Sequence, residues 1–385
     1  MNSGIFRELA DFHRFFWRTP RSDKRVVIYV EDGAYRAYLD GIIHELINMH
    51  GETVCYVSSD ANDATLTSGE KGIRTFYLRA LLPAFMRVVR CRVFIMTLTD
   101  LDQFHLKRSA YPVHYVYVFH SLVSTHMAFR PGAYDHYDSI LCAGPHHVRE
   151  IRKREELYGL PQKNLIEAGY FRLERIYSAY REFVKKKPPS GKPVALVAPS
   201  WGKHNIIESC GTKLIRTLLD DNIAVIVRPH PETIKRSPDI VRSLEETFSS
   251  YPDFTLERTV ATDDSLLISD VLITDYSGIA LEYAFGTERP VLFLDVPVKV
   301  HNPNYEELEL EPIELRLRPQ LGVAVSPRDI ALVPLRVKEL IAHRESYRRA
   351  LAKLREEYIF AFGNSSEVSG RYIMNVIMGD ERMLL

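Results

Sequence analysis

Apolar runs of four to six residues alternate with segments of helical periodicity along the whole chain. Runs that predict buried strands lie at 25–30, 53–57, 73–77, 92–97, 114–119, 139–142, 193–198, 223–228, 254–257, 271–274, 290–294 and 322–325. Helical patterns lie at 36–49, 79–90, 145–158, 173–185, 207–220, 237–250, 263–268, 277–286, 327–361 and 365–378. This alternation predicts an α/β protein in which helices wrap parallel sheets.

The stretch KKKPPSGK at 185–192 interrupts the alternation and has the composition of a linker. It predicts two doubly wound, Rossmann-like domains, 1–188 and 189–385, with the helical tail in the second. Two such domains are expected to face a cleft. Because ligands of open parallel sheets bind beyond the carboxyl ends of the strands, functional residues are expected directly after strands.

Length and charge agree with two domains and reveal an asymmetry between them. The 385 residues exceed one ordinary core. The 50 Lys+Arg and 50 Asp+Glu residues cancel, but residues 1–192 hold 28 basic against 21 acidic residues and the rest hold 22 against 29. The neutral total therefore does not exclude an anionic partner. Nucleic acid is not expected, because the basic residues are not interleaved with a stacking platform.

The sequence predicts a cytoplasmic protein. Four cysteines without a C-x-x-C pair predict free thiols in a reducing compartment. No apolar run reaches the ~18 residues that span a bilayer, and charged residues near the N-terminus interrupt any signal sequence. Residues 5–18, IFRELADFHRFFWR, combine apolar positions at helical spacing with arginines, as a helix at a membrane interface does. A peripheral location at the inner face of the cell membrane stays open, and a helix packed on the second domain is the alternative.

Two histidines follow predicted strands. His120 comes after 114–119, where a histidine can act as a general base near neutral pH; a half-buried histidine bonded to the backbone is the alternative. His230 lies between two prolines that restrict the backbone around it. Arg228, two residues earlier, has a planar guanidinium suited to phosphate oxygens. This group suits an anionic reaction centre, and a proline-stiffened turn is the alternative.

The turn after 271–274 has the features of a phosphate site. A helix N-terminus offers free N–H groups, Ser277 adds a hydroxyl, and Gly278 permits close approach of a ligand. Glu282 is placed to accept hydrogen bonds from ribose hydroxyls. The alternative is a simple helix cap by Ser277 or Asp275, with Glu282 paired to an arginine.

A further strand end carries Ser200 and Gly202 in a short turn, which is either a substrate loop or an ordinary connection. The chain lacks the phosphate-loop, dinucleotide and serine-hydrolase motifs. No grouping of His, Cys and Asp has metal-ligand spacing, so neither a metal nor a cofactor is expected.

Three motifs together resemble the CDP-glycerol glycerophosphotransferase family, which includes the teichoic-acid primases and polymerases. They are RPHP at 228–231, TDYSGIALEYA at 274–284 and RPVLFLD at 289–295. Further family segments correspond in the same order to His120, Gly169–Arg172 and Ala198–Trp201. The resemblance covers about 110–300 and implies a GT-B-type fold, with the acceptor on the first domain and the nucleotide held mainly by the second.

The resemblance also implies roles for single residues. His120 and His230 would be the essential histidines, one of them activating the acceptor hydroxyl. Arg228, Ser277 and Gly278 would hold the diphosphate and Glu282 would lie near the ribose. Ser200 and Asp275 complete the expected substrate-binding set.

The implied reaction is displacement at the β-phosphorus of a CDP-alditol, which releases CMP and passes alditol phosphate to an anionic polymer or lipid-linked acceptor. The residues around His120 and the stretch 296–321 depart from the family pattern. Two other interpretations stay open. One is a GT-B glycosyltransferase that uses a nucleotide sugar in capsule or cell-envelope polysaccharide synthesis, and the other is a non-catalytic module that binds nucleotide or glycan phosphate.

Overall fold

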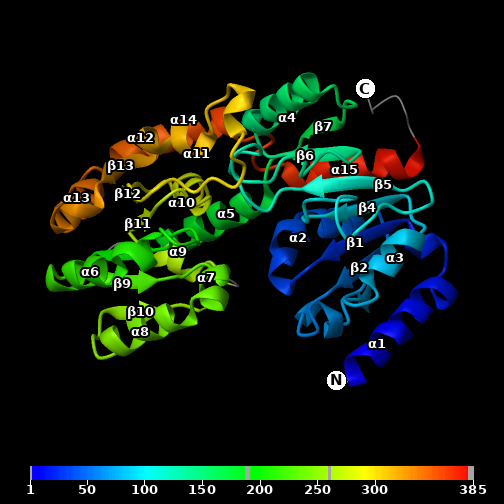
Figure 1. The fold of residues 1–385 in the computed structure, drawn as a ribbon, viewed down its shortest axis with the longest axis horizontal. Helices are drawn as coiled ribbons and strands as arrows, with labels where there is room; N and C mark the ends of the chain where they lie inside the picture. Colours follow the sequence, from blue (N-terminus) through cyan, green and yellow to red (C-terminus); the bar gives the residue numbers. More distant parts are fainter. Residues whose placement is uncertain (1, 187–190, 259–261, 380–385) are drawn as a thin grey trace. The chain divides into compact units, whose positions relative to one another are not determined.

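The computed structural model describes residues 2–186, 191–258 and 262–379, and these form two compact units (Figure 1). Unit 1 comprises the described residues within 1–120, 129–172 and 359–385, and unit 2 those within 121–128 and 173–358. The units thus divide the chain differently from the expected boundary at 188 and 189. Linker residues 187–190 lie outside the described residues.

Unit 1 is built on a seven-stranded sheet in the order β3-β2-β1-β4-β5-β6-β7, in which every pair is parallel. The strands are β1 (Val26–Val30), β2 (Val54–Ser58), β3 (Ile73–Tyr77), β4 (Val93–Met96), β5 (His114–Val118), β6 (Ser139–Cys142) and β7 (Asn164–Glu167). The helices are α1 (Asn2–His13), α2 (Arg36–His44), α3 (Leu82–Val88), α4 (Pro145–Tyr158) and α15 (Ser365–Met378), and π-helical turns at Arg14–Arg18 and Glu45–Met49 extend α1 and α2.

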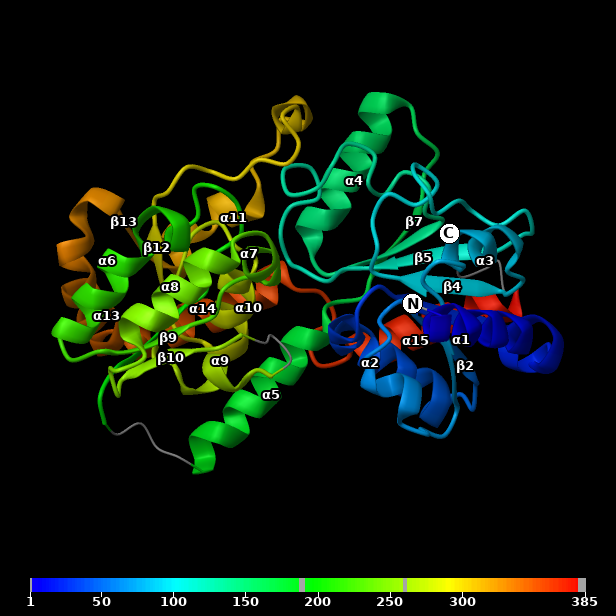
Figure 2. The ribbon, with the colours of Figure 1, turned by 60° about the horizontal axis from the view of Figure 1, so that its bottom comes forward.

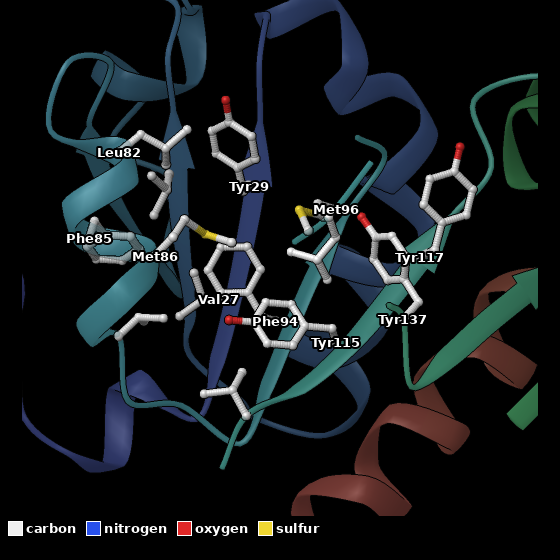
Figure 3. Packing of buried hydrophobic residues seen from close by; sticks show 14 of the residues in the cluster. Val27, Tyr29, Leu82, Phe85, Met86, Phe94, Met96, Tyr115, Tyr117 and Tyr137 are labelled. Atoms are coloured by element: carbon white, nitrogen blue, oxygen red, sulfur yellow. The ribbon is translucent and has the colours of Figure 1, made fainter. Parts of the chain in front are cut away.

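Alternate residues of each strand in unit 1 enter different cores, because successive side chains point to opposite faces. Figure 3 shows one core, in which Phe94 and Tyr115 of the strands pack with Phe85 and Met86 of α3. On the other face, strand residues pack against α2 and against α15, which contributes Ile373. Both faces of the sheet are therefore covered, as a parallel sheet requires.

Unit 2 repeats this arrangement with six parallel strands in the order β10-β9-β8-β11-β12-β13. The strands are β8 (Val194–Val197), β9 (Ala224–Val227), β10 (Phe254–Leu256), β11 (Val271–Thr274), β12 (Val291–Leu294) and β13 (Gly322–Val325). The helices are α5 (Phe171–Lys186), α6 (Ile206–Asp220), α7 (Pro231–Arg236), α8 (Pro238–Phe248), α9 (Asp264–Ile268), α10 (Ile279–Thr287), α11 (Ile313–Arg316), α12 (Arg318–Leu321), α13 (Val333–Ala342) and α14 (Arg344–Tyr358).

Helices α6, α8 and α13 cover one face of this second sheet and share a core with it. Helix α10 packs against α14 and α5, and Gly286 of α10 makes room for Ile176 of α5. The prediction of two doubly wound, Rossmann-like sheets is confirmed.

Several parts of the chain depart from the predicted pattern, and the short helices α7, α11 and α12 lie outside the predicted helical segments. Strand β7 was not predicted, and the helix expected over 327–361 is divided into a 3₁₀ segment, α13 and α14. Pro334 lies in the first turn of α13, where proline is tolerated because the first N–H groups lack helical partners. Helix α15, expected in the second domain, belongs to unit 1, where Tyr372 contacts the hydroxyl of Ser139.

The four cysteines are free, with Cys55 and Cys142 buried and Cys91 and Cys210 partly buried. Among the described residues, no helix combines the length and the apolar character that crossing a bilayer requires.

Candidate active site

The strand order of unit 2 reverses between β8 and β11, and two of the predicted site residues meet there. The Asp275 carboxylate, at the end of β11, accepts hydrogen bonds from the Ser200 backbone N–H at 2.8 Å and the Ser200 hydroxyl at 3.1 Å. Burial raises the pKa of Asp275 above its ordinary value, and the bonds from Ser200 act in the opposite direction. Asp275 therefore joins the loops after β8 and β11 at the point where open sheets bind ligands.

The turn before α10 leaves the Ser277 hydroxyl available. Helix α10 begins after Gly278 without a side-chain cap. The Ser277 hydroxyl has no hydrogen-bond partner within the described part of the chain and lies beside the first N–H groups of the helix, an arrangement that suits an anion. Gly278 also allows residues 121–123 to pack closely against this turn, because a Cβ at this position would collide with Ser121 and approach Val123.

Arg228 has a different environment from the one expected. Its Nε and Nη2 atoms donate to the two carboxylate oxygens of Glu257 at 2.8 and 3.0 Å, and Nη2 also donates to the Thr262 carbonyl at 2.8 Å. The side chain is only 4% exposed. The guanidinium therefore holds the loop after β10 against the end of β9, which makes Arg228 a positioning residue.

His230 is the N-cap of α7. Its Nδ1 accepts from the backbone N–H of Glu232 at 3.1 Å, and Pro231 opens the helix. Burial, with a smaller effect of the nearby Lys299, lowers the pKa of His230 to about 4. The ring is thus neutral at pH 7, and because Nδ1 is the acceptor, the proton lies on Nε2.

A cluster of aromatic and basic side chains surrounds Trp201, and the sequence interpretation missed most of it. Lys299 Nζ lies 3.6 Å and Arg236 Cζ 5.0 Å from the centre of the indole ring system, and the rings of His230 and His301 lie 6.2 and 5.6 Å from it. Lys299 and His301 belong to the stretch 296–321, which carried no recognised motif. Their only sequence signal was a lysine and a histidine shortly after a predicted strand.

Lys299 is the cation of this cluster that lacks an ion pair among the described residues, whereas Arg236 pairs with Glu232. Burial lowers the pKa of Lys299 to about 8, while Asp275 and Glu232 act in the opposite direction. At pH 7 the cluster therefore contains an ammonium group available to an anion. Glu282, by contrast, is 5% exposed on the buried side of α10.

In unit 1, His120 follows β5 and is oriented by the end of β4. Its Nδ1 lies 3.1 Å from the Thr97 carbonyl oxygen, which can only accept, so Nδ1 carries the proton and Nε2 has the free lone pair. Rings of Tyr35 and Phe129 lie 5.5 and 5.9 Å away. Burial lowers the pKa of His120 to about 4, although the bond to Thr97 acts in the opposite direction.

The structure thus brings Ser200, Arg228, His230, Asp275, Ser277 and Gly278 to one edge of the unit 2 sheet. His120 occupies the corresponding edge of unit 1. The neighbouring His126 is buried, and its Nε2 bonds to the Leu310 carbonyl. In the ranges that the structure describes, no group of three or more His, Cys, Asp or Glu residues is arranged to hold a metal ion.

Residues 15–301 match the family model described as CDP-Glycerol:Poly(glycerophosphate) glycerophosphotransferase. The chain belongs to this family.

Curated relatives match a shorter part of the chain. The teichoic acid poly(glycerol phosphate) polymerase of Bacillus spizizenii is 27% identical over 159 residues, which is 37% of this chain and 38% of that protein. The teichoic acid ribitol-phosphate polymerase TarL of Staphylococcus aureus is 28% identical over 152 residues, which is 36% of this chain and 26% of that protein. The chain thus covers well under two thirds of these relatives.

Solved structures resemble the whole chain in fold. The wall teichoic acid polymerase TagF, soaked with CDPG, has a TM-score of 0.61 at 15% identity and covers 99% of both chains. The UDP-GlcNAc 2-epimerase of Neisseria meningitidis has a TM-score of 0.59 at 12% identity, over 91% of this chain and 99% of that one. At these identities the likeness concerns the fold, which is of GT-B type as expected.

Replacing Arg228 tests its positioning role. We expect Arg228→Met to lower the free energy of unfolding of unit 2 by about 3 kcal/mol, because the Glu257 carboxylate loses its buried partner. The two tryptophans lie in different units, so in a Trp17→Phe background urea unfolding followed by Trp201 fluorescence reports on unit 2.

The matched control is Arg236→Met. Arg236 also pairs with a glutamate but its side chain is 62% exposed, so we expect a loss of no more than about 1 kcal/mol. Equal urea midpoints for the two variants would contradict the positioning role.

Proposed function

We propose that this protein transfers glycerol phosphate, or a related alditol phosphate, from a CDP-activated donor to a hydroxyl of a surface-polymer or lipid-linked acceptor. In this reaction the acceptor oxygen forms a bond to the β-phosphorus, the bond from that phosphorus to the bridging oxygen breaks, and CMP leaves. Family membership supports the reaction class. The observation that carries the proposal is the opposite orientation of the two histidines.

His120 has the orientation of a general base. Its Nδ1 proton is held by the Thr97 carbonyl, and the Nε2 lone pair is free to take the proton of the acceptor hydroxyl. The low pKa keeps the ring neutral, and thus able to accept a proton, at pH 7. An anionic acceptor beside the ring raises this pKa towards neutrality and so strengthens the base.

His230 has the orientation of a donor. Its Nδ1 is used by the Glu232 backbone N–H, so Nε2–H is available to a phosphate oxygen. We assign diphosphate binding to His230, to Ser277 with the N-terminus of α10, and to Lys299. Positioning and charge stabilisation are the main needs of phosphoryl transfer, and these groups supply both without Arg228.

We place this reaction at the cytoplasmic face of the cell membrane. A lipid-linked or polymeric anionic acceptor would be held there, and residues 5–25 of unit 1 hold six Lys and Arg against three acidic residues. The test below identifies the donor's head group and the acceptor.

The test is nucleotide release from a donor panel. We expect CMP release from CDP-glycerol or CDP-ribitol in the presence of a lipid-linked acceptor, and no nucleotide release from UDP- or CMP-sugars. His120→Ala should lower kcat by roughly 10²–10⁴-fold, because proton transfer from the acceptor is lost. His126→Gln is the control, since His126 bonds to the Leu310 carbonyl in the same loop region.

The nucleotide that is released distinguishes the alditol-phosphate transferase from the glycosyltransferase and from the non-catalytic module. UDP or CMP release from a sugar donor supports the glycosyltransferase, and binding without turnover of any donor supports the non-catalytic module. Normal turnover in His120→Ala would contradict the assignment of His120 as the general base.

Lys299 provides a test of nucleotide binding that does not depend on the acceptor. Since its pKa is about 8, its positive charge is lost as the pH rises through this value, and affinity for CDP should fall between pH 7 and pH 9.5. Lys299→Met should weaken CDP binding by about tenfold at pH 7 and remove this pH dependence. Calorimetric titration measures both effects.

The control is Lys235→Met, which removes the same charge from a side chain that is 77% exposed. We expect it to bind CDP like the original chain. A pH dependence that persists in Lys299→Met would assign the titration to another group.

A further inference from the structure

Three aromatic rings surround the imidazole of His120. The ring centroids of Tyr35, Tyr38 and Phe129 lie 5.5, 6.2 and 5.9 Å from that of His120, with interplanar angles of 87°, 74° and 88°. Because each ring is steeply inclined to the imidazole, none of the three stacks on it. All four residues are partly exposed, so solvent reaches them. We call Tyr35, Tyr38 and Phe129 the His120 ring cluster.

Unit 1 holds these rings in place. Tyr35 ends a 3₁₀ turn that Asp32 caps with its carboxylate. Tyr38 lies in the first turn of α2, which packs beside α15 on one face of the sheet (Figure 2). The Tyr38 ring centre lies 6.2 Å from that of Tyr170 and 5.3 Å from Cζ of Arg172, and both of these neighbours are buried. The cluster is therefore formed before a ligand arrives.

The charges at this edge of the sheet are negative. The first four residues after β1, β4 and β5 include Glu31, Asp32 and Asp100 but neither Lys nor Arg. The Glu31 carboxylate makes no hydrogen bond or ion pair in the described ranges, and its partial burial, with a smaller effect of Asp32, raises its pKa. Burial raises the pKa of Tyr117, with further effects of Asp100 and Glu31, and the Tyr117 hydroxyl lies 3.4 Å from His120 Nδ1. A phosphate group beside the base would therefore meet like charges.

Neighbouring cations are paired or lie against other groups. Arg36 pairs with Asp40 and Glu70 at 2.8 and 2.6 Å. Arg130 is exposed, with its Cζ 5.6 Å from the ring centre of Phe104. The diphosphate site proposed in unit 2 has the opposite character, with an ammonium group and a helix N-terminus. The surroundings of His120 thus suit a neutral group with many hydroxyls.

We propose that the His120 ring cluster binds a sugar ring, so that the hydroxyl that attacks the phosphorus belongs to a neutral glycan end of the acceptor. The C–H face of a pyranose packs on aromatic rings, and its hydroxyl groups donate hydrogen bonds to carboxylates such as that of Glu31. A glycerol phosphate or ribitol phosphate end offers no such face and carries a phosphate close to its reacting hydroxyl. The description of the family names poly(glycerophosphate), so a sugar acceptor sets this chain apart.

This inference rests on the proposed function and specifies its acceptor. The reaction that supplies such an acceptor is a glycosyl transfer, because a sugar has to be attached to the lipid or polymer before alditol phosphate reaches it. The anionic linkage of the acceptor then lies further from the base than the sugar does.

The first test measures sugar binding without turnover. Saturation-transfer NMR of the full chain with excess CDP, which fills the donor site, should show contact with the ring protons of methyl glycosides of glucose, galactose, N-acetylglucosamine or N-acetylgalactosamine. Tyr35→Leu keeps the apolar contact of this residue with the core but removes its aromatic face, so it should weaken binding about fivefold.

Two controls accompany this test. Tyr35→Phe keeps the ring and should bind like the original chain. Tyr111→Leu should do the same, because it changes another tyrosine of unit 1 that is 38% exposed. No contact with any of the glycosides, or equal binding by Tyr35→Leu, would overturn the proposal.

The second test compares acceptors during turnover of CDP-glycerol and CDP-ribitol. Octyl glycosides of the same sugars should support CMP release, and phosphatidylglycerol, which ends in glycerol phosphate, should support about tenfold less. Tyr35→Leu should raise KM for the glycoside about fivefold and leave KM for the donor unchanged. A preference for phosphatidylglycerol would overturn the sugar site and retain the proposed function. Absence of CMP release with every acceptor would contradict only the proposed function, because the NMR test measures sugar binding without a reaction.

Discussion

Parallel pairing of the strands is the constraint on which the rest of this structure depends. A parallel sheet needs a helix or long connection between successive strands, and both of its faces must be covered. All carboxyl ends of one sheet then lie at one edge. In each unit the first strand lies centrally, so the chain changes direction between β1 and β4 and between β8 and β11. Residues distant in sequence, such as Ser200 and Asp275, meet there because of this order.

Most of the fold could be predicted because the strands are buried on both faces and their composition is correspondingly apolar. Strand β7 was not predicted from the sequence. Asn164–Glu167 forms an edge of the sheet and is only partly buried, so its sequence mixes polar and apolar residues. The placement of α15 in unit 1 also could not be predicted. Its apolar side is compatible with either sheet, and only tertiary contacts such as those of Ile373 decide between them.

The electrostatics of the site could be predicted only in part, because charge and position along the chain do not reveal partners. Arg228 follows a strand as a phosphate-binding arginine would, but Glu257 follows the next strand of the same sheet and accepts from its Nε and Nη2 atoms. Lys299 lies in a segment without a motif, yet the structure places it over Trp201. An acidic second half and an anionic ligand are thus compatible, since one unpaired ammonium group and one helix N-terminus act locally where water is partly excluded.

Main-chain groups, not side chains, determine the orientation of both histidines. The carbonyl of Thr97 selects the His120 tautomer, and the N–H of Glu232 selects that of His230. Every residue other than proline offers the same backbone N–H and carbonyl groups. Side chains around these histidines can therefore change while His120 keeps its proton on Nδ1 and His230 keeps its proton on Nε2. A departure of residues 119–122 from the family pattern is therefore compatible with an unchanged orientation of the His120 ring. Under the proposed function, variation in this loop bears on which acceptor fits beside His120.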